Sequence, residues 1–499
     1  MLINTLTPED QLYQEVIQHI QNHSKLVLAF SGGLDSTVLL DILHTINTQT
    51  QSNTYNISTP FTLRAIHIHH GLNYYSNHWA KHCFKECKKR NIPFNLIYAH
   101  YNKKNNQGGI EATARQIRYQ KLFENIYKQE TLLTAQHLND QAETFLLALK
   151  RGSGPKGLSG MQKKTFFSKY QLLLRPFLQC TKEQIQLYAK KKKLIWITDN
   201  SNSNTRFDRN FLRLQIMPIL KNRWPGINHT ISRSAQLCAE QETLLDELLQ
   251  QELKSLYHTD QSLLLKPLIH MSIQKRQALI RRWLTNFNIQ MPSYDKLNHI
   301  WNNIILSKKD STPIMVLNKE NLLRRFQNRL YIIPKSTQTL LNDIIIPWNN
   351  FKKRITLPNN LGTLTSIKSS NIKSYLLDEK KNHIKKIILL PNNFWQSNYI
   401  NKKILTLSLV RSPNKQEKIS IRFKYLQNSN IRIIGKVHSK KIKKIWQELK
   451  IPPWIRNNTP LLFYNNKLIS ALGIFTTQDG NITNKSKVAG IFWLQKTIK

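Results

Sequence analysis

Short apolar runs and amphipathic stretches alternate through the N-terminal part of the chain. Each apolar run has the length and composition of a buried strand, and each amphipathic stretch carries apolar residues at helical spacing. The predicted strands are residues 26–30, 63–70, 94–100, 131–136 and 194–198. The predicted helices are residues 37–45, 76–90, 110–127, 140–150 and 182–192. This alternation predicts an α/β fold with a doubly wound parallel sheet, which binds ligands at the carboxyl ends of its strands.

The pattern changes near Trp224. Residues 228–305 are rich in Leu, Gln, Glu and Arg at helical spacing, and no glycine occurs from 228 to 360, so a helical domain is expected. Short β-like runs separated by turns follow, and they predict a small mixed α/β domain. Residues 368–404 are crowded with Lys and Asn and are expected to form a surface insertion. We therefore predict three domains, at residues 1–222, 223–335 and 336–499.

A hexapeptide with the sequence SGGLDS joins the first predicted strand to the first predicted helix. It consists of Ser31, Gly32, Gly33, Leu34, Asp35 and Ser36. The glycines let the backbone approach a ligand closely, and the N–H groups at a helix N-terminus favour an anion. The serine hydroxyls add donors, and the Asp35 carboxylate can hold Mg²⁺ or orient phosphates. The motif is neither Walker A nor the dinucleotide-binding pattern, but it predicts a phosphate site.

A second polar motif closes the fourth predicted strand and opens the next helix. Asp140 and Glu143 are three residues apart and project from one face of that helix, with His137 one turn earlier. Beside a phosphate site these carboxylates could bind Mg²⁺ or a cationic substrate, although helix capping alone would also explain them. Arginines recur around the same predicted cleft, at Arg115, Arg118, Arg151, Arg206, Arg209 and Arg213.

Charge and cysteine content narrow the class of protein. The 499 residues include 74 Lys and Arg against 29 Asp and Glu, and a net charge of +45 suits a nucleic-acid partner, although biased codon usage would also raise the lysine count. Four cysteines are too few for a secreted disulfide scaffold. With no signal peptide and no membrane-length apolar run, a soluble cytoplasmic protein is expected. His78, His82, Cys83 and Cys87 share one predicted helix and lack the separated arms of a zinc site.

Taken together, the motifs resemble those of the tRNA(Ile)-lysidine synthetases, a family of PP-loop or N-type ATP pyrophosphatases. The resemblance runs nearly end to end. It rests on SGGLDS, HIHHGLN, GIEATARQIRY, TAQHLNDQAETFLLALKRGSGPKGLSGM, LLRPFL, DNSNSNTRFDRNFLR and, near the C-terminus, KKIKKIWQELKIPPWIRNNTPLLFYNNKLISALGIF. All PP-loop enzymes share SGGxDS, whereas residues 134–161 and the PPW segment are specific to this family.

The resemblance implies a two-step reaction that uses ATP and Mg²⁺. The C2 carbonyl of the wobble cytidine in a CAU-anticodon tRNA(Ile) is adenylated with release of pyrophosphate, and the ε-amine of free lysine then attacks C2 and expels AMP. The product, lysidine, switches the tRNA from methionine to isoleucine. The PP-loop domain would carry the chemistry, and the helical and C-terminal domains would bind tRNA. No membrane partner is implied, and the oligomeric state is left open.

The same resemblance implies roles for particular residues. The candidate catalytic residues are Asp35, His137, Asp140 and Glu143, with Asp35 also the Mg²⁺ ligand. The candidate tRNA contacts are Arg115, Arg118, Arg151, Arg209, Lys440, Lys441, Lys443, Lys444 and Arg456. Family members often have aspartate where this chain has Asn139, so Asp140 is expected to be the important carboxylate. Relatives also tend to carry glycines around residue 438, where this chain reads Gly435-Lys436-Val437-His438-Ser439.

Three other classes of protein are compatible with parts of the sequence. A PP-loop tRNA thiolase that uses an iron–sulfur cluster or a persulfide would need cysteine pairs, and the chain has no C-x-x-C. A small-molecule adenylating enzyme would share SGGLDS but would not need such a basic chain or the C-terminal domain. A non-catalytic tRNA-binding relic would not be expected to keep SGGLDS, Asp140 and Glu143.

Overall fold

The computed structural model folds into two compact units, Met1–Leu245 and Asp246–Lys499, which are described separately. The residues that the structure describes are 7–49, 60–71, 74–99, 110–168, 171–199, 203–258, 260–287, 289, 291–308, 311–338, 341, 344–351, 353–368, 386–389, 404–425, 429–483 and 487–495. No helix in these ranges is long and apolar enough to cross a bilayer.

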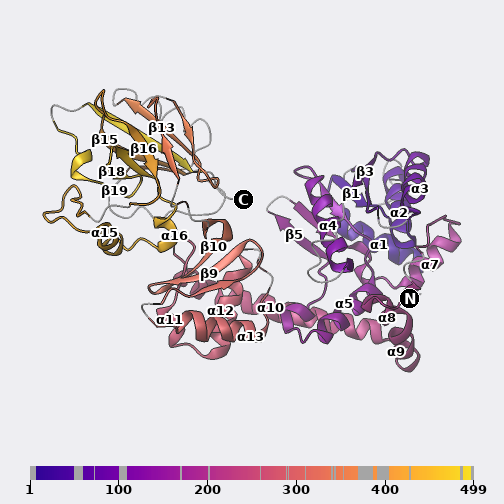
Figure 1. The fold of residues 1–499 in the computed structure, drawn as a ribbon. Helices are drawn as coiled ribbons and strands as arrows, with labels where there is room; N and C mark the ends of the chain where they lie inside the picture. The colour runs from indigo at the N-terminus through magenta and orange to yellow at the C-terminus, as the bar shows by residue number, and fades with distance from the viewer. Residues whose placement is uncertain are drawn as a thin grey trace. The chain divides into compact units, whose positions relative to one another are not determined.

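The first unit is built on one six-stranded sheet with the strand order β3-β2-β1-β4-β6-β5 (Figure 1). The strands are β1 (Lys25–Ala29), β2 (Thr62–His69), β3 (Phe94–Tyr98), β4 (Thr131–Leu133), β5 (Lys164–Ser168) and β6 (Gln171–Leu174). All neighbouring pairs are parallel except β5 and β6, which form an antiparallel hairpin at one edge. The chain moves outward from β1 in both directions, so the switch point of the sheet lies between β1 and β4.

One predicted strand is wrong. Residues 194–198 are extended but belong to no sheet, and the fifth parallel strand is β6. The N–H of Ile197 donates to the Gly32 carbonyl at 2.8 Å instead of joining a ladder. Leu194 and Trp196 pack against the main core, which explains why this segment is apolar.

Helices cover both faces of this sheet, as the doubly wound prediction requires. They are α1 (Pro8–Ile20), α2 (Leu34–Gln49), α3 (Ser76–Lys89), α4 (Ile110–Glu124), α5 (Leu138–Lys150) and α7 (Lys182–Lys191). Alternate residues of β1 enter two separate cores. Leu26 and Leu28 pack with side chains of α1, α2, α3 and α7, whereas Val27 packs with Leu122 and Phe123 of α4. Burial on both faces explains why the strands are continuously apolar.

The rest of the first unit continues from α7 through short helices. These are α8 (Asp208–Phe211), the π-helical turn η5 (Leu212–Ile216), α9 (Met217–Arg223) and the long α10 (Ile227–Leu256), which runs on into the second unit. Met217 and Ile231 pack against Ala142 of α5. This packing fixes α8 and η5 next to the helix that carries Asp140 and Glu143.

The second unit begins with a region that is less purely helical than predicted. Its helices are α11 (Lys266–Ile269), α12 (Ile273–Thr285), α13 (Tyr294–His299) and the π-helical turn η6 (Ile300–Ile305). A four-stranded antiparallel sheet accompanies them, in the order β7-β10-β9-β8. Its strands are β7 (Leu263–Leu264), β8 (Ile314–Val316), β9 (Asn321–Phe326) and β10 (Arg329–Pro334).

Two five-stranded sheets form most of the C-terminal region, in the orders β11-β16-β17-β18-β19 and β12-β13-β20-β15-β14. Their strands are β11 (Ile345–Pro347), β12 (Ile355–Thr356), β13 (Thr363–Lys368), β14 (Lys386–Leu389), β15 (Ile404–Arg411), β16 (Ile419–Arg422), β17 (Leu461–Tyr464), β18 (Lys467–Ala471), β19 (Phe475–Thr476) and β20 (Val488–Gln495). A shared core that includes Trp348, Leu364, Leu462 and Ile491 joins the sheets. Apart from β14 and the strand ends beside it, the predicted insertion at 368–404 lies outside the described residues.

Two short helices, α15 (Ile442–Glu448) and α16 (Pro453–Arg456), complete the mixed α/β composition of this region. The tryptophan of the PPW segment packs α16 against strands β9 and β10. The Trp454 ring of α16 packs against Phe326 and Tyr331 of β9 and β10, with centroids 6.0 and 5.2 Å away. The Arg324 guanidinium lies 4.9 Å from the Trp454 ring centroid.

Candidate functional site

The SGGLDS loop leaves the carboxyl end of β1 and runs directly into α2. The Ser36 hydroxyl donates to the Gly33 carbonyl at 3.0 Å, and the hydroxyls of Ser31 and Ser36 lie 3.0 Å apart. The Thr37 N–H makes the first helical bond to Gly33, also at 3.0 Å. The loop is therefore tied back on itself at the helix N-terminus, where the helix dipole attracts an anion.

Gly32 is the one position of this loop that cannot carry a side chain. Its φ is +79°, in the left-handed region, and a Cβ there would lie 2.8 Å from Cys83 Sγ and 2.9 Å from Ile197 Cδ1. The buried Cys83 of α3 in turn lies 3.4 Å from His67 Nδ1 of β2, and that nitrogen is 2.9 Å from the Phe30 carbonyl. Helix α3, strand β2 and the segment around Ile197 thus pack against the buried side of this loop.

The carboxylate of Asp35 sits in the first turn of α2. Its side chain is 34% exposed, but Oδ1 is buried and has no hydrogen-bond partner among the described residues. Burial raises the pKa of Asp35, and Asp140 adds to the rise while His137 opposes it. A carboxylate with an unsatisfied buried oxygen beside a phosphate loop fits Mg²⁺, which is held by one or two protein carboxylates together with substrate phosphates.

The second motif lies beside the first because β4 is the neighbour of β1. His137 caps the N-terminus of α5, and its Nε2 lies 3.7 Å from Asp35 Oδ2 and 3.6 Å from Asp140 Oδ2. These separations are longer than hydrogen bonds. The backbone N–H of His137 donates to Asp140 Oδ2 at 3.2 Å, and His137 Nδ1 is buried without a partner in the described structure. His137 and Asp140 therefore both cap α5 and belong to a cluster of titratable groups.

Two arginines clamp the carboxylates of α5. Glu143 is 1% exposed, and its two oxygens accept from Arg209 Nε at 2.8 Å and from Arg213 Nε at 2.7 Å. Arg213 Nη2 also reaches Glu143 Oε2 and Asp140 Oδ1, both at 2.9 Å. The second oxygen of Asp140 faces away from this clamp, toward His137.

The clamp changes the titration of its members. Burial alone would raise the pKa of Asp140, but His137, Arg209 and Arg213 outweigh it and lower the pKa. Burial opposes the charge of both arginines as well, yet the two carboxylates raise the pKa of Arg209 and of Arg213. Asp140, Arg209 and Arg213 therefore stay ionised at neutral pH. Both oxygens of Glu143 already accept from the arginines, so neither is left to offer a substrate.

The structure gathers some of the predicted site residues and separates others. Asp35, His137, Asp140, Glu143 and Arg209 form one cluster. Arg115 instead lies over the Tyr119 ring of α4, 5.3 Å from its centroid. Arg118 lies near His70. Burial and, to a smaller extent, the charge of Arg118 lower the pKa of His70 to about 4. Arg151 is exposed at the opposite end of α5 from His137, about 20 Å away at 1.5 Å per helical residue.

Sequence reasoning counted Arg209 and Arg213 among the clustered arginines and proposed Arg209 as a tRNA contact, but it did not foresee that both hold Glu143. The signal was present, because the two arginines are four residues apart and point from one helical face. No local signal identifies the supports of Gly32. Cys83 and Ile197 lie 51 and 165 positions further along the chain, so only the fold brings them to the loop.

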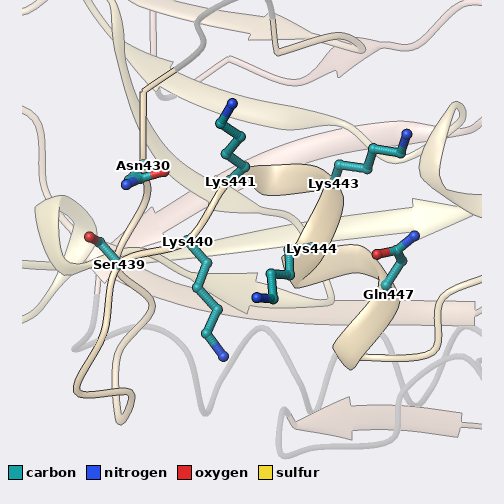
Figure 2. Close-up of a pocket in the computed structure, with 7 residues that line it drawn as sticks. All are labelled: Asn430, Ser439, Lys440, Lys441, Lys443, Lys444 and Gln447. Atoms are coloured by element: carbon teal, nitrogen blue, oxygen red, sulfur yellow. The ribbon is translucent and has the colours of Figure 1, made fainter.

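The predicted lysine cluster lies in the second unit, where it lines a surface depression of about 420 Å³. The lining residues are Asn430, Ser439, Lys440, Lys441, Lys443, Lys444 and Gln447 (Figure 2). Lys440 is paired with Glu448 at 2.6 Å. In the described part of the chain no carboxylate lies within ion-pair distance of Lys441, Lys443 or Lys444. Arg456 is half-buried, and its Nε donates to the Ile451 carbonyl at 2.7 Å.

Comparison with known proteins matches three separate parts of this chain to family models. Residues 6–220 match the PP-loop domain, residues 263–331 match the TilS substrate binding domain, and residues 419–493 match the TilS substrate C-terminal domain. Among curated relatives, the tRNA(Ile)-lysidine synthase of Blochmanniella pennsylvanica is 47% identical over 99% of this chain and 96% of its own. That of Pectobacterium atrosepticum is 40% identical, over 97% of this chain and 98% of its own. A solved structure, the U34-tRNA thiolase NcsA from Methanococcus maripaludis, covers 47% of this chain and 80% of its own at 17% identity, with a TM-score of 0.39.

Proposed function

Because the chain belongs to the tRNA(Ile)-lysidine synthase family, we propose that it joins free lysine to C2 of the wobble cytidine in a CAU-anticodon tRNA, with ATP converted to AMP and pyrophosphate. The observation that carries this proposal is the juxtaposition of the SGGLDS loop with the His137–Asp140 cluster at one edge of the sheet. A predicted phosphate site thereby lies beside a predicted site for a cation. The reaction needs both, because ATP is used in its first step and the lysine ammonium is bound for its second.

In the first half-reaction the C2 carbonyl oxygen of cytidine attacks the α-phosphorus of ATP, and the bond to pyrophosphate breaks. The N–H groups at the start of α2 and the hydroxyls of Ser31 and Ser36 would hold the departing phosphates. Asp35 would hold Mg²⁺, which supplies charge neutralisation for the leaving pyrophosphate when bound. The buried, unpartnered Oδ1 of Asp35 supports this assignment.

In the second half-reaction the lysine ε-amine forms a bond to C2 and the bond from C2 to the AMP oxygen breaks. Asp140 Oδ2 is the carboxylate oxygen of α5 that faces away from the arginine clamp, so Asp140 would orient the lysine ammonium. Its lowered pKa suits binding a cation better than accepting a proton. We therefore assign proton acceptance to His137 and give Glu143 the role of positioning residue for Arg209 and Arg213.

The second unit would bind the tRNA body, with phosphates held by Lys441, Lys443 and Lys444. The enzyme would act in the cytoplasm, where ATP, lysine and tRNA occur together. Nothing in the site favours the thiolase alternative. Burial raises the pKa of Cys83, of Cys87 to about 12 and of Cys180 to about 12, so these thiols stay protonated and unreactive.

The test is incorporation of labelled lysine into a CAU-anticodon tRNA(Ile) transcript by the purified protein with ATP and Mg²⁺. We expect one lysine per tRNA, one AMP and one pyrophosphate, and no incorporation when the wobble cytidine is replaced by uridine. Pyrophosphate release without lysine incorporation would contradict the proposal. So would sulfur transfer to the same tRNA.

A further inference from the structure

Three exposed tyrosines lie at the carboxyl-end edge of the first unit's sheet, outside the cluster described above. Tyr74 is 94% exposed, Tyr75 is 55% exposed and Tyr98 is 56% exposed. Aromatic rings bury 150–250 Å² each when they are covered, at roughly 25 cal/mol per Å², so leaving three of them in water forgoes a large stabilisation. We call these residues the tyrosine patch.

Contacts of the patch residues and of His69 involve β2, β3 and the start of α3. His69 and Tyr98 are register partners at the ends of β2 and β3, and their rings are 5.0 Å apart. His69 Nε2 lies 2.9 Å from Asn77 Oδ1 in the first turn of α3. The rings of Tyr74 and Tyr75, which precede that turn, are 5.5 Å apart in an edge-to-face arrangement. Tyr98 is the last residue of β3, and Tyr74 and Tyr75 lie between β2 and α3, so all three lie at the carboxyl-end edge of the sheet.

The helix that starts at this patch also touches the SGGLDS loop. Cys83 and His82 of α3 lie 2.8 and 3.6 Å from the position that a Gly32 Cβ would take. From Ser76 to Cys83 the helix rises about 10 Å. That distance is about three stacked bases at about 3.4 Å each. The patch therefore lies within reach of bases next to one that is bound at the SGGLDS loop.

Charge next to the patch matches a nucleic acid. Lys81, Lys85 and Lys88 form one exposed stripe along α3, at spacings of four and three residues. None of them has a carboxylate within ion-pair distance in the described ranges, whereas their neighbour Lys89 is paired with Glu86 at 2.7 Å. Exposed rings next to unneutralised lysines are the combination that binds single-stranded nucleic acid, since every base has a face to stack and a phosphate to pair.

We propose that the tyrosine patch stacks the unpaired bases that flank the target cytidine in the anticodon loop, while the α3 lysines contact the backbone between them. This inference rests on the proposed function. It identifies the protein surface that would bind the anticodon loop of the RNA beside the reacting base. The patch residues belong neither to the SGGLDS loop nor to the His137–Asp140 cluster, so the role assigned to them is binding of RNA.

The test uses the full chain and a CAU anticodon stem–loop RNA that carries 2-aminopurine at one loop position at a time. Each of Tyr74→Ala, Tyr75→Ala and Tyr98→Ala should weaken stem–loop binding about 5- to 150-fold, the cost of one lost stacking contact. Tyr74→Phe should bind like the parent, because it keeps the ring. At least one flanking 2-aminopurine should be quenched by the parent and not by the alanine variants.

Tyr127→Ala is the matched control. Tyr127 is 73% exposed but lies just before β4, at the amino-terminal edge of the same sheet, so this variant should bind the stem–loop normally. A fully paired hairpin RNA should bind the patch variants and the parent equally. In lysine incorporation the patch variants should raise KM for tRNA and leave kcat unchanged.

Several outcomes would overturn the inference. Patch variants that bind the stem–loop as tightly as Tyr127→Ala would do so, and so would an equal loss for paired RNA. If the variants instead keep RNA binding but lose self-association in sedimentation, the patch is a protein interface. Stem–loop binding is measured without ATP or lysine, so failure of the parent to incorporate lysine would refute the proposed function and not this inference.

Discussion

Replacement of Glu143 by Gln tests whether this residue acts on lysine or holds two arginines. The substitution keeps the shape of the side chain but exchanges one accepting oxygen for an NH₂ group. That group would face the N–H donors of Arg209 or Arg213, which now lie 2.7 to 2.9 Å from the Glu143 oxygens. Two half-buried guanidinium groups would then share the single carboxylate of Asp140.

The expected cost follows from burial. Glu143 is 1% exposed, and removal of one partner from a buried ion pair costs about 3–5 kcal/mol because the other charge is left uncompensated. Domains are stable by about 5–15 kcal/mol, so the variant should still fold, with a clearly lower unfolding temperature. Replacing both Glu143 and Arg213 by Gln should cost less than the sum of the two single changes, because neither is then left with an unpaired charge.

The assay measures thermal unfolding and the two half-reactions separately. Glu183→Gln is the matched control, since Glu183 accepts from Lys221 at 2.9 Å but is 60% exposed, and such surface pairs are worth about 0–1 kcal/mol. If Glu143 positions the arginines, Glu143→Gln should slow pyrophosphate release and lysine transfer together. Asp140→Asn should slow lysine transfer much more than pyrophosphate release, so that adenylated tRNA accumulates.

Two results would refute this reasoning. An unfolding temperature of Glu143→Gln equal to that of Glu183→Gln would show that the clamp does not stabilise the fold. Selective loss of lysine transfer in Glu143→Gln, with normal pyrophosphate release, would return Glu143 to the role of a group that acts on the lysine amine.

Three further predictions concern the phosphate loop and the lysine depression. Burial raises the pKa of Asp35 above its value in the unfolded chain, so ionised Asp35 opposes folding near neutral pH and not below the unfolded pKa of 3.8. Asp35→Asn should therefore raise the unfolding temperature at neutral pH, with the gain lost at lower pH, while pyrophosphate release falls about 10²–10³-fold; a destabilised variant would contradict this. Gly32→Ala should destabilise the protein by about 2–5 kcal/mol through backbone strain and the contact with Cys83, and adding Cys83→Ala should restore part of the loss in calorimetry. Lys441→Ala, Lys443→Ala and Lys444→Ala should each lower the slope of log tRNA affinity against log salt by about one, and unchanged slopes would place the phosphate contacts elsewhere.

Local sequence was sufficient for the fold class and for the phosphate loop. A strand, two glycines and a helix start are encoded within about ten residues, and alternation of period 2 and period 3.6 segments specifies parallel βα units. The same local rules failed at residues 194–198, where the apolar side chains pack on a core formed elsewhere and the backbone bonds to Gly32. They also missed the sheet of β7 to β10, which accompanies the predicted helices.

What the sequence determined by itself is therefore the chemistry available to this protein: a phosphate loop with Asp35, a helix start with His137, Asp140 and Glu143, and a large positive charge. Only the tertiary structure determined which of those groups pair with one another. It paired Glu143 with arginines 66 and 70 positions away and left one oxygen of Asp140 outside this clamp, next to His137. It also brought tyrosines from two strand ends to one edge of the sheet. Partner choice of this kind depends on distances between segments remote in sequence, which short-range periodicity and turn chemistry do not specify.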